Sequence, residues 1–194
     1  MSNIQIGSVA MNDQRKRIHP HKFTLWVGIG SIVMMFAGLT SAYIVKRNLA
    51  NWITFDIPSV FWYSTVVIIV SSLAIMTSRK YFKQGEMAKY RRWLAVTMCL
   101  GSLFILMQTF GFIDLWKNGI TLTRSVSFSF LYIIVGLHAL HIVAGVIALL
   151  IISVKAFSVK RKTYSSLSID LMSIYWHFVD FLWIYLFIFL LIIR

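Results

Sequence analysis

Long apolar runs alternate with short polar segments along the chain. Roughly 20 apolar residues cross the hydrocarbon core of a membrane as a helix, because a helix rises about 1.5 Å per residue. Five runs reach that length, at about residues 23–45, 58–77, 93–113, 125–154 and 171–193. The pattern predicts an all-α integral membrane protein, with a five-helix transmembrane bundle at 23–194 that follows an N-terminal segment at 1–22.

Composition supports this class. Of the 194 residues, 59% are hydrophobic and 13% are charged, whereas about a quarter of a soluble domain is charged. The net charge of +13 could indicate nucleic-acid binding. In a chain this apolar, however, basic residues are typical of loops at an anionic membrane surface. We therefore expect no nucleic-acid partner.

The basic residues also predict an orientation. The N-terminal segment and the second and fourth loops carry fourteen Lys and Arg, and the opposite side carries five. Short cytoplasmic loops hold the excess of Lys and Arg. The N-terminus is therefore expected in the cytoplasm and the C-terminus in the periplasm. The brief segment ahead of the first run favours a bacterial inner (plasma) membrane.

Tryptophans and small residues suggest how the helices are surrounded. Six tryptophans fall near predicted span ends, where headgroup-level positions suit their amphipathic rings: Trp26, Trp52, Trp62, Trp93, Trp116 and Trp176. Small residues that allow close helix contact form one seam on the first helix (Gly28, Ser31, Gly38, Ala42) and another on the fourth (Ala144, Gly145, Ala148). These seams indicate either packing within the bundle or docking to a larger partner.

Four ionisable residues fall inside the predicted spans: His138, His141, His177 and Asp180. His138 and His141 are three residues apart and share a helix face, and so do His177 and Asp180. A cluster between the last two helices is therefore expected. A structural, hydrogen-bonded role is the first interpretation. His141 with His177 could instead ligate a heme or another metal, or the cluster could relay protons.

Two further polar residues lie singly within the spans. Gln108 on the third helix and Thr65 on the second are each expected to make a hydrogen bond between helices.

Two strings in the last two helices resemble a known family. GLHALHIVAG at 136–145 and YWHFVDFLW at 175–183 are similar to the signature segments of subunit III of heme-copper terminal oxidases, the cytochrome c oxidase family. The hairpin from 58 to 108, with its basic turn KQGE at 83–86, fits the same family. The resemblance covers residue 23 to the C-terminus and matches a short, five-helix bacterial form.

The resemblance implies an accessory subunit of a proton-pumping oxidase of the aerobic respiratory chain. Such a subunit has no active site, heme or copper of its own and stabilises the catalytic subunit and its proton uptake. Expected partners are catalytic subunit I, other oxidase subunits, membrane lipids and a respiratory supercomplex. The parent complex could also be a quinol oxidase or a nitric-oxide-reductase assembly. Outside the family, a free-standing proton or ion transporter is the alternative.

Some positions depart from the family pattern. Ile32 and Gly111 stand where the family usually has glutamates, so no role of those carboxylates is carried over. The spacing of a family lipid-headgroup site falls on Lys155, fourteen residues after His141. These two residues are the expected phospholipid contacts.

Overall fold

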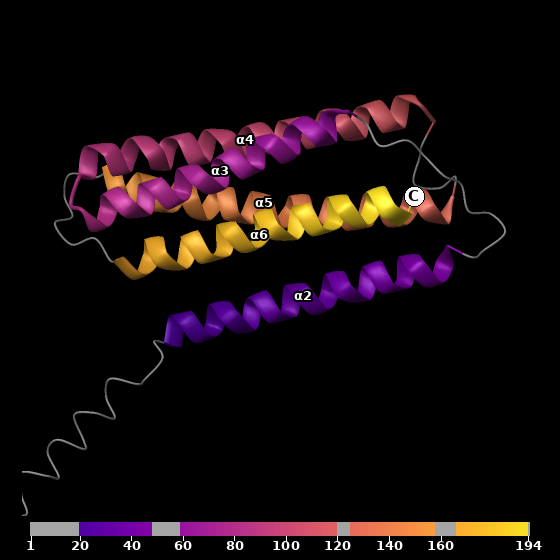
Figure 1. Ribbon diagram of the computed structural model, residues 1–194, viewed down its shortest axis with the longest axis horizontal. Coiled ribbons are helices and arrows are strands. Elements are labelled where there is room, and N and C mark those ends of the chain that lie inside the picture. Colours follow the sequence, from indigo (N-terminus) through magenta and orange to yellow (C-terminus); the bar gives the residue numbers. More distant parts are fainter. Residues whose placement is uncertain (1–19, 48–58, 120–124, 158–165, 194) are drawn as a thin grey trace, which may run out of the picture.

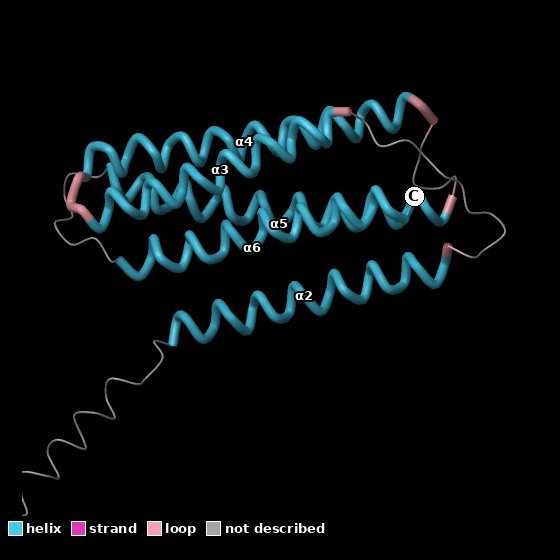
Figure 2. Tube along the Cα trace, in the orientation of Figure 1, coloured by secondary structure: helices cyan, strands magenta, loops and turns pink. Residues whose placement is uncertain are grey.

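The computed structural model describes residues 20–47, 59–119, 125–157 and 166–193, nearly all of them helical (Figure 2). The helices are α2 (Pro20–Lys46), α3 (Val60–Lys83), α4 (Met87–Lys117), α5 (Val126–Phe157) and α6 (Ser166–Ile193). All five are long and apolar enough to cross a membrane. The predicted five-helix α fold is confirmed. Trp52 and most of the predicted N-terminal segment lie outside the described residues.

The helices extend past the apolar runs at their charged ends. Helix α4 begins at Met87 rather than near 93, and α3 continues to Lys83 rather than ending near 77. In this extension the ring of Phe82 meets the edge of Tyr90, with ring centroids 5.1 Å apart. Long basic side chains can lie along apolar surface while their charges reach water, so a helix continues where the apolar run has ended.

A glycine turn joins α3 to α4. Gly85 has a φ of +78°, a conformation that glycine adopts without the penalty a Cβ brings. The N–H of Glu86 donates to the carbonyl of Tyr81, and the N–H of Gly85 donates to that of Phe82. This is the Schellman pattern that ends many helices. It reverses the chain so that α3 and α4 pack side by side.

Helices α3 to α6 form a four-helix bundle, and α2 lies outside it against α5 and α6 (Figure 1). Successive helices run in opposite directions, so the first and last described residues lie at opposite ends. Thr40 of α2 shares a hydrogen bond with the Tyr185 hydroxyl of α6 at 3.1 Å. The ring of Tyr43 meets Phe189 of α6 edge-on at 5.4 Å.

Tryptophans near the helix ends divide into two groups. Trp26, Trp62 and Trp116 are more than half exposed, and Trp93 is 38% exposed, as expected of side chains that meet lipid headgroups. Trp176 is 1% exposed, so its predicted headgroup position is wrong. It points into the bundle because glycines on two neighbouring helices leave space for its ring.

Candidate functional site

His138 lies among aromatic rings inside the bundle. It is fully buried on α5, and its ring stacks on Trp183 of α6 with centroids 5.2 Å apart and an interplanar angle of 30°. Phe36 of α2 and Phe104 of α4 meet it edge-on. Neither ring nitrogen has a hydrogen-bond partner among the described residues. His138 therefore joins three other helices to α5 by packing.

His141 lies one turn further along α5 and is half-buried. Its Nδ1 is 2.7 Å from the carbonyl oxygen of Leu137, so Nδ1–H donates and Nε2 is left as an acceptor. The backbone carbonyl of His141 accepts a hydrogen bond from the Tyr175 hydroxyl of α6 at 3.0 Å. This bond ties α5 to α6 at the level of His141.

His177 on α6 faces α3 rather than α5, and Asp180 follows it on α6. The Nδ1 of His177 is 2.6 Å from the Ser72 hydroxyl oxygen of α3. Asp180 is 3% exposed. Neither carboxyl oxygen of Asp180 has a hydrogen-bond partner among the described residues.

The four predicted residues therefore do not form one cluster. His138 and His141 contact aromatic and backbone groups, His177 bonds to a hydroxyl of α3, and the Asp180 carboxyl is buried without a hydrogen-bond partner among the described residues. Across the described ranges, no group of three or more His, Cys, Asp or Glu side chains could hold a metal ion. The histidines of α5 and α6 stay apart because α3 supplies a row of hydroxyls to α6, whereas bulky rings fill the space between α5 and α6.

Trp176 is a contact centre that sequence reasoning missed. Its indole N–H donates to the Ser71 hydroxyl of α3 at 3.1 Å. Its ring lies against Gly101 of α4 and Gly145 of α5, where an added Cβ would come within 2.7 and 3.1 Å of ring atoms. One side chain thus holds three neighbouring helices, and the two glycines were the sequence signal for it.

Trp183, two turns later on α6, also contacts three neighbouring helices. Its indole N–H donates to the Thr65 hydroxyl of α3 at 3.0 Å. Its ring meets Phe104 of α4 edge-on at 5.2 Å and stacks on His138 of α5. The seven-residue spacing of Trp176 and Trp183 puts both on one face of α6.

The two single polar residues behave as predicted. Gln108 of α4 donates from Nε2 to the Ser64 hydroxyl of α3 at 3.0 Å, in a fully buried setting. Thr65 accepts the hydrogen bond from Trp183. Both interhelical hydrogen bonds are confirmed.

An ion pair that sequence reasoning did not predict closes one end of the α3–α6 contact. Arg79 Nε donates to Asp170 Oδ1 at 2.5 Å, and the two side chains are 40% and 21% exposed. Both residues lie just outside the predicted spans at 58–77 and 171–193, but α3 continues to Lys83 and α6 begins at Ser166. The pair therefore links two helices.

The two small-residue seams have different surroundings. Gly145 of α5 is buried against Trp176, so that seam packs within the bundle. On α2, a Cβ added at Gly28 or Gly38 would meet nothing within 4 Å. Ser31 and Ala42 are also exposed. The α2 seam is thus open along its length in the isolated chain.

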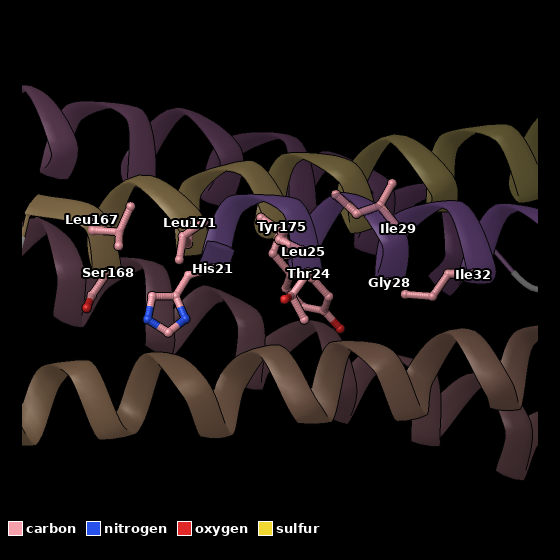
Figure 3. Close-up of a pocket in the computed structure, with 10 residues that line it drawn as sticks. All are labelled: His21, Thr24, Leu25, Gly28, Ile29, Ile32, Leu167, Ser168, Leu171 and Tyr175. Carbon is pink, nitrogen blue, oxygen red and sulfur yellow. The ribbon is translucent and has the colours of Figure 1, made fainter. Parts of the chain in front are cut away.

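A cleft of about 590 Å³ separates α2 from the first half of α6. It is lined by His21, Thr24, Leu25, Gly28, Ile29, Ile32, Leu167, Ser168, Leu171 and Tyr175 (Figure 3). Leucine and isoleucine side chains form most of its wall, and His21 and Ser168 lie at one end of it. Neither expected lipid contact, Lys155 or His141, lines this cleft. Lys155 is exposed in the last turn of α5.

Comparison with known proteins gives a family. The family model described as "Cytochrome c oxidase subunit III" matches residues 21–193, which is nearly the whole chain. The chain belongs to the cytochrome c oxidase subunit III family. "Cytochrome c oxidase subunit 3" of Corynebacterium diphtheriae is 31% identical over 178 residues, covering 84% of this chain and 85% of that protein.

Other bacterial relatives agree. "Probable cytochrome c oxidase subunit 3" of Mycobacterium tuberculosis is 30% identical over 189 residues, covering 92% of this chain and 93% of that protein. "Cytochrome c oxidase subunit 3" of Bacillus subtilis is 26% identical, covering 84% and 81%. The resemblance drawn from the two strings is confirmed. The chain is a subunit III of a heme-copper oxidase, a multi-pass membrane protein in an oxidoreductase complex with other oxidase subunits.

The two positions that depart from the expected subunit III pattern lie in different surroundings. Ile32, at the position where the resemblance implies a glutamate, lines the α2–α6 cleft. Gly111, the second such position, lies against Phe61 of α3, and an added Cβ would come within 2.6 Å of that ring. A glutamate would fit at Gly111 only if Phe61 moved.

Proposed function

We propose that this subunit III is a non-catalytic member of its oxidase, without heme or copper of its own. In this proposal it docks on catalytic subunit I and stabilises that subunit and its proton uptake. The open seam of α2 is the observation that carries the docking proposal. Small residues let helix backbones approach closely in lipid, and a Cβ added at Gly28 or Gly38 would meet no described atom within 4 Å.

The surroundings of the histidines also support a non-catalytic role. The Nδ1 of His141 is hydrogen-bonded to a backbone carbonyl, and that of His177 to Ser72. The ring of His138 lies between aromatic groups of α6, α4 and α2. A bis-histidine heme needs two ligands on opposite sides of one cavity. These rings instead face different helices, which favours the structural interpretation.

The orientation remains part of the proposal. Fourteen Lys and Arg on one side against five on the other favour a cytoplasmic N-terminus by the positive-inside rule. The bacterial origin of the relatives supports a bacterial inner membrane. The end of the bundle with Arg79 and Asp170 is then cytoplasmic.

Substitutions on the α2 seam test the docking. Gly28→Leu and Gly38→Leu add bulk to a face that the chain leaves empty, so each should leave the chain inserted but reduce recovery of the heme-bearing subunits in a tagged purification. Gly30→Leu is the matched control, since Gly30 has equally free space but lies about 110° from the seam centre at 100° per residue. Equal recovery for all three variants would argue against docking through this seam.

We also propose that a phospholipid lies along α5, with its anionic headgroup at Lys155 and an acyl chain passing His141. Fourteen residues span about 21 Å of helix, so the two cannot share one headgroup. The apolar wall of the α2–α6 cleft suits a second acyl chain. Native mass spectrometry should show one bound lipid fewer in Lys155→Ala than in a Lys117→Ala control from the opposite end of the bundle. Unchanged lipid retention in Lys155→Ala would count against the headgroup assignment.

A further inference from the structure

Helices α3 and α4 carry a cluster of basic residues around the turn that joins them. Six Lys and Arg lie between residues 78 and 93, and Glu86 is the one acidic residue in that interval. Both helices continue into the interval, since α3 ends at Lys83 and α4 begins at Met87. The basic side chains are therefore held at fixed positions on helix faces rather than spread along a loop.

Groups within the chain engage only part of this cluster. Arg79 pairs with Asp170 of α6, and Lys89 pairs with Glu86. Arg91 is half-buried, with its guanidinium over an aromatic ring of α5. The other three basic residues are exposed, and no ion pair engages them within the part of the chain that the structure describes: Lys80, Lys83 and Arg92. We call these three residues the cationic edge. Their charges are available to a group outside the chain.

The cationic edge lies at the ends of two exposed apolar stripes, one on each helix. The stripe on α3 leads to Lys80 and Lys83 and consists of Val66, Ile69, Leu73 and Met76. The stripe on α4 leads away from Arg92 and consists of Val96, Leu103, Leu106 and Phe110. Steps of three, four and seven residues keep side chains on one helix face. Each cation therefore continues the face that the apolar side chains form.

These two helices lie on the side of the bundle away from α2 (Figure 1). Helix α2 packs against α5 and α6, and it has no contact with α3 or α4 among the described residues. The stripes are therefore separate from both the α2 seam and the α2–α6 cleft.

Each stripe has the length of one lipid leaflet. Ile69 lies eleven residues before Lys80, and Leu103 lies eleven residues after Arg92, which is about 16 Å of helix in both cases. Half of a hydrocarbon core is about 15 Å thick. Trp93, beside Arg92, is 38% exposed, and its amphipathic ring suits the headgroup level. A phosphate at the cationic edge would thus have its acyl chains along the apolar part of the same faces.

The size of the exposed side chains favours a lipid over a helix of another subunit. Close helix contact in a membrane uses small residues, as on the α2 seam. The stripes instead present large side chains, and Met76, Leu103 and Phe110 are 54%, 43% and 64% exposed. Such faces keep a second helix backbone at a distance, whereas flexible acyl chains can fill the space between the side chains.

We propose that the cationic edge binds anionic phospholipids, whose phosphates contact Lys80, Lys83 and Arg92 and whose acyl chains lie along the two stripes. An arginine can hold a phosphate through two parallel N–H donors, and a lysine through its ammonium. A zwitterionic headgroup brings a cation of its own, which these side chains repel. The site goes beyond the proposed docking of α2, and it lies on other helices than the lipid proposed at Lys155.

Photo-crosslinking of the purified oxidase complex in vesicles tests this site. The vesicles contain equal parts of phosphatidylcholine and phosphatidylglycerol, with a trace of one of these two lipids carrying a photoreactive group in its acyl chain. Peptide mass spectrometry then measures the labelling of α3 and α4. A single cation near an anionic surface accounts for about a fivefold preference. The phosphatidylglycerol probe should therefore label the stripes at least about fivefold more than the phosphatidylcholine probe.

Neutralising the cationic edge should remove this preference. In the triple variant Lys80→Gln, Lys83→Gln, Arg92→Gln the two probes should label the stripes equally. A matched control removes three exposed positive charges from the opposite end of the bundle, by Lys46→Gln, Arg47→Gln and Lys117→Gln. This control should keep the wild-type preference, because its charges lie in the other leaflet.

Several results would overturn the proposal. They are equal labelling by the two probes in the wild type, a preference that survives in the triple variant, and a preference that the matched control also loses. Absence of labelling by both probes would show that a protein partner covers the stripes instead of lipid. Should the triple variant fail to assemble, Lys80→Gln and Arg92→Gln are measured singly. Each should lower the preference, and an unchanged preference in both would count equally against the site.

Discussion

Replacing Gly101 by alanine should destabilise the bundle although alanine is the better helix former. The new Cβ would lie 2.7 Å from Cη2 and 2.9 Å from Cζ2 of Trp176, and 3.2 Å from a methyl of Val146. The Trp176 ring has little freedom to move away. It is 1% exposed, its N–H is held by Ser71, and the neighbouring Cζ3 and Cε3 atoms of the ring lie against Gly145.

The expected size follows from two opposing terms. Overpacking a buried site costs about 1–3 kcal/mol, and alanine in place of a helical glycine gains up to about 1 kcal/mol. The difference leaves a net loss of up to about 2 kcal/mol of unfolding free energy. Gly136→Ala on α5 is the matched control, because a Cβ there meets nothing within 4 Å. Only the propensity term then applies, so Gly136→Ala should be neutral or slightly stabilising.

The assay is unfolding of the chain in mixed micelles titrated with dodecyl sulfate and followed by helical circular dichroism. Trp176→Phe completes a double-mutant cycle, because phenylalanine lacks the ring atoms that Gly101→Ala would strike. In the Trp176→Phe background, Gly101→Ala should lose its overpacking cost, so the coupling free energy should equal that term, about 1–3 kcal/mol. The reasoning is refuted if Gly101→Ala matches Gly136→Ala, or if it costs the same in both backgrounds.

Four further substitutions can be measured by the same titration. Trp183→Phe should cost about 1–3 kcal/mol of unfolding free energy, because it loses both a hydrogen bond and ring contacts. Thr65→Val removes the hydrogen bond from Trp183 but none of the ring contacts, so it should cost less. Equal costs would contradict the packing role of the Trp183 ring. Gln108→Leu should cost less than about 1.7 kcal/mol, the upper range for one interhelical hydrogen bond in a membrane, and a larger loss would show that Gln108 does more. Asp170→Asn should cost less than about 1 kcal/mol of unfolding free energy, because the ion pair with Arg79 is partly exposed. The loss should shrink in high salt, and a loss that does not change with salt would exclude a screened ion pair.

The number and type of elements could be predicted from the sequence because the physical requirement is simple. A span needs a sufficiently long apolar run, and the five runs are separated by charged segments. Helix ends are harder to predict. Between Thr77 and Trp93 the chain is strongly basic, yet two helices and a glycine turn occupy nearly all of it. Apolarity reports where lipid is, whereas backbone hydrogen bonding decides where the helix ends.

The interior could be predicted only in part. Spacing correctly placed His138 and His141 on α5 and predicted that Gln108 and Thr65 would bond between helices. It could not show that His177 meets α3, because that depends on which helix lies beside that face of α6. For the same reason, the sequence did not predict that Trp176 points into the bundle. Its space comes from glycines on two other helices, and a single sequence does not say which helices are neighbours.

The most direct test of the central claim is a mild-detergent purification of the tagged chain, with mass spectrometry and a reduced-minus-oxidised optical spectrum. An accessory subunit without redox centres should bring heme bands together with a larger multi-helix subunit, and should be colourless once harsher detergent has removed that subunit. Heme that stays with the isolated chain would contradict the accessory role and restore His141 and His177 as ligands.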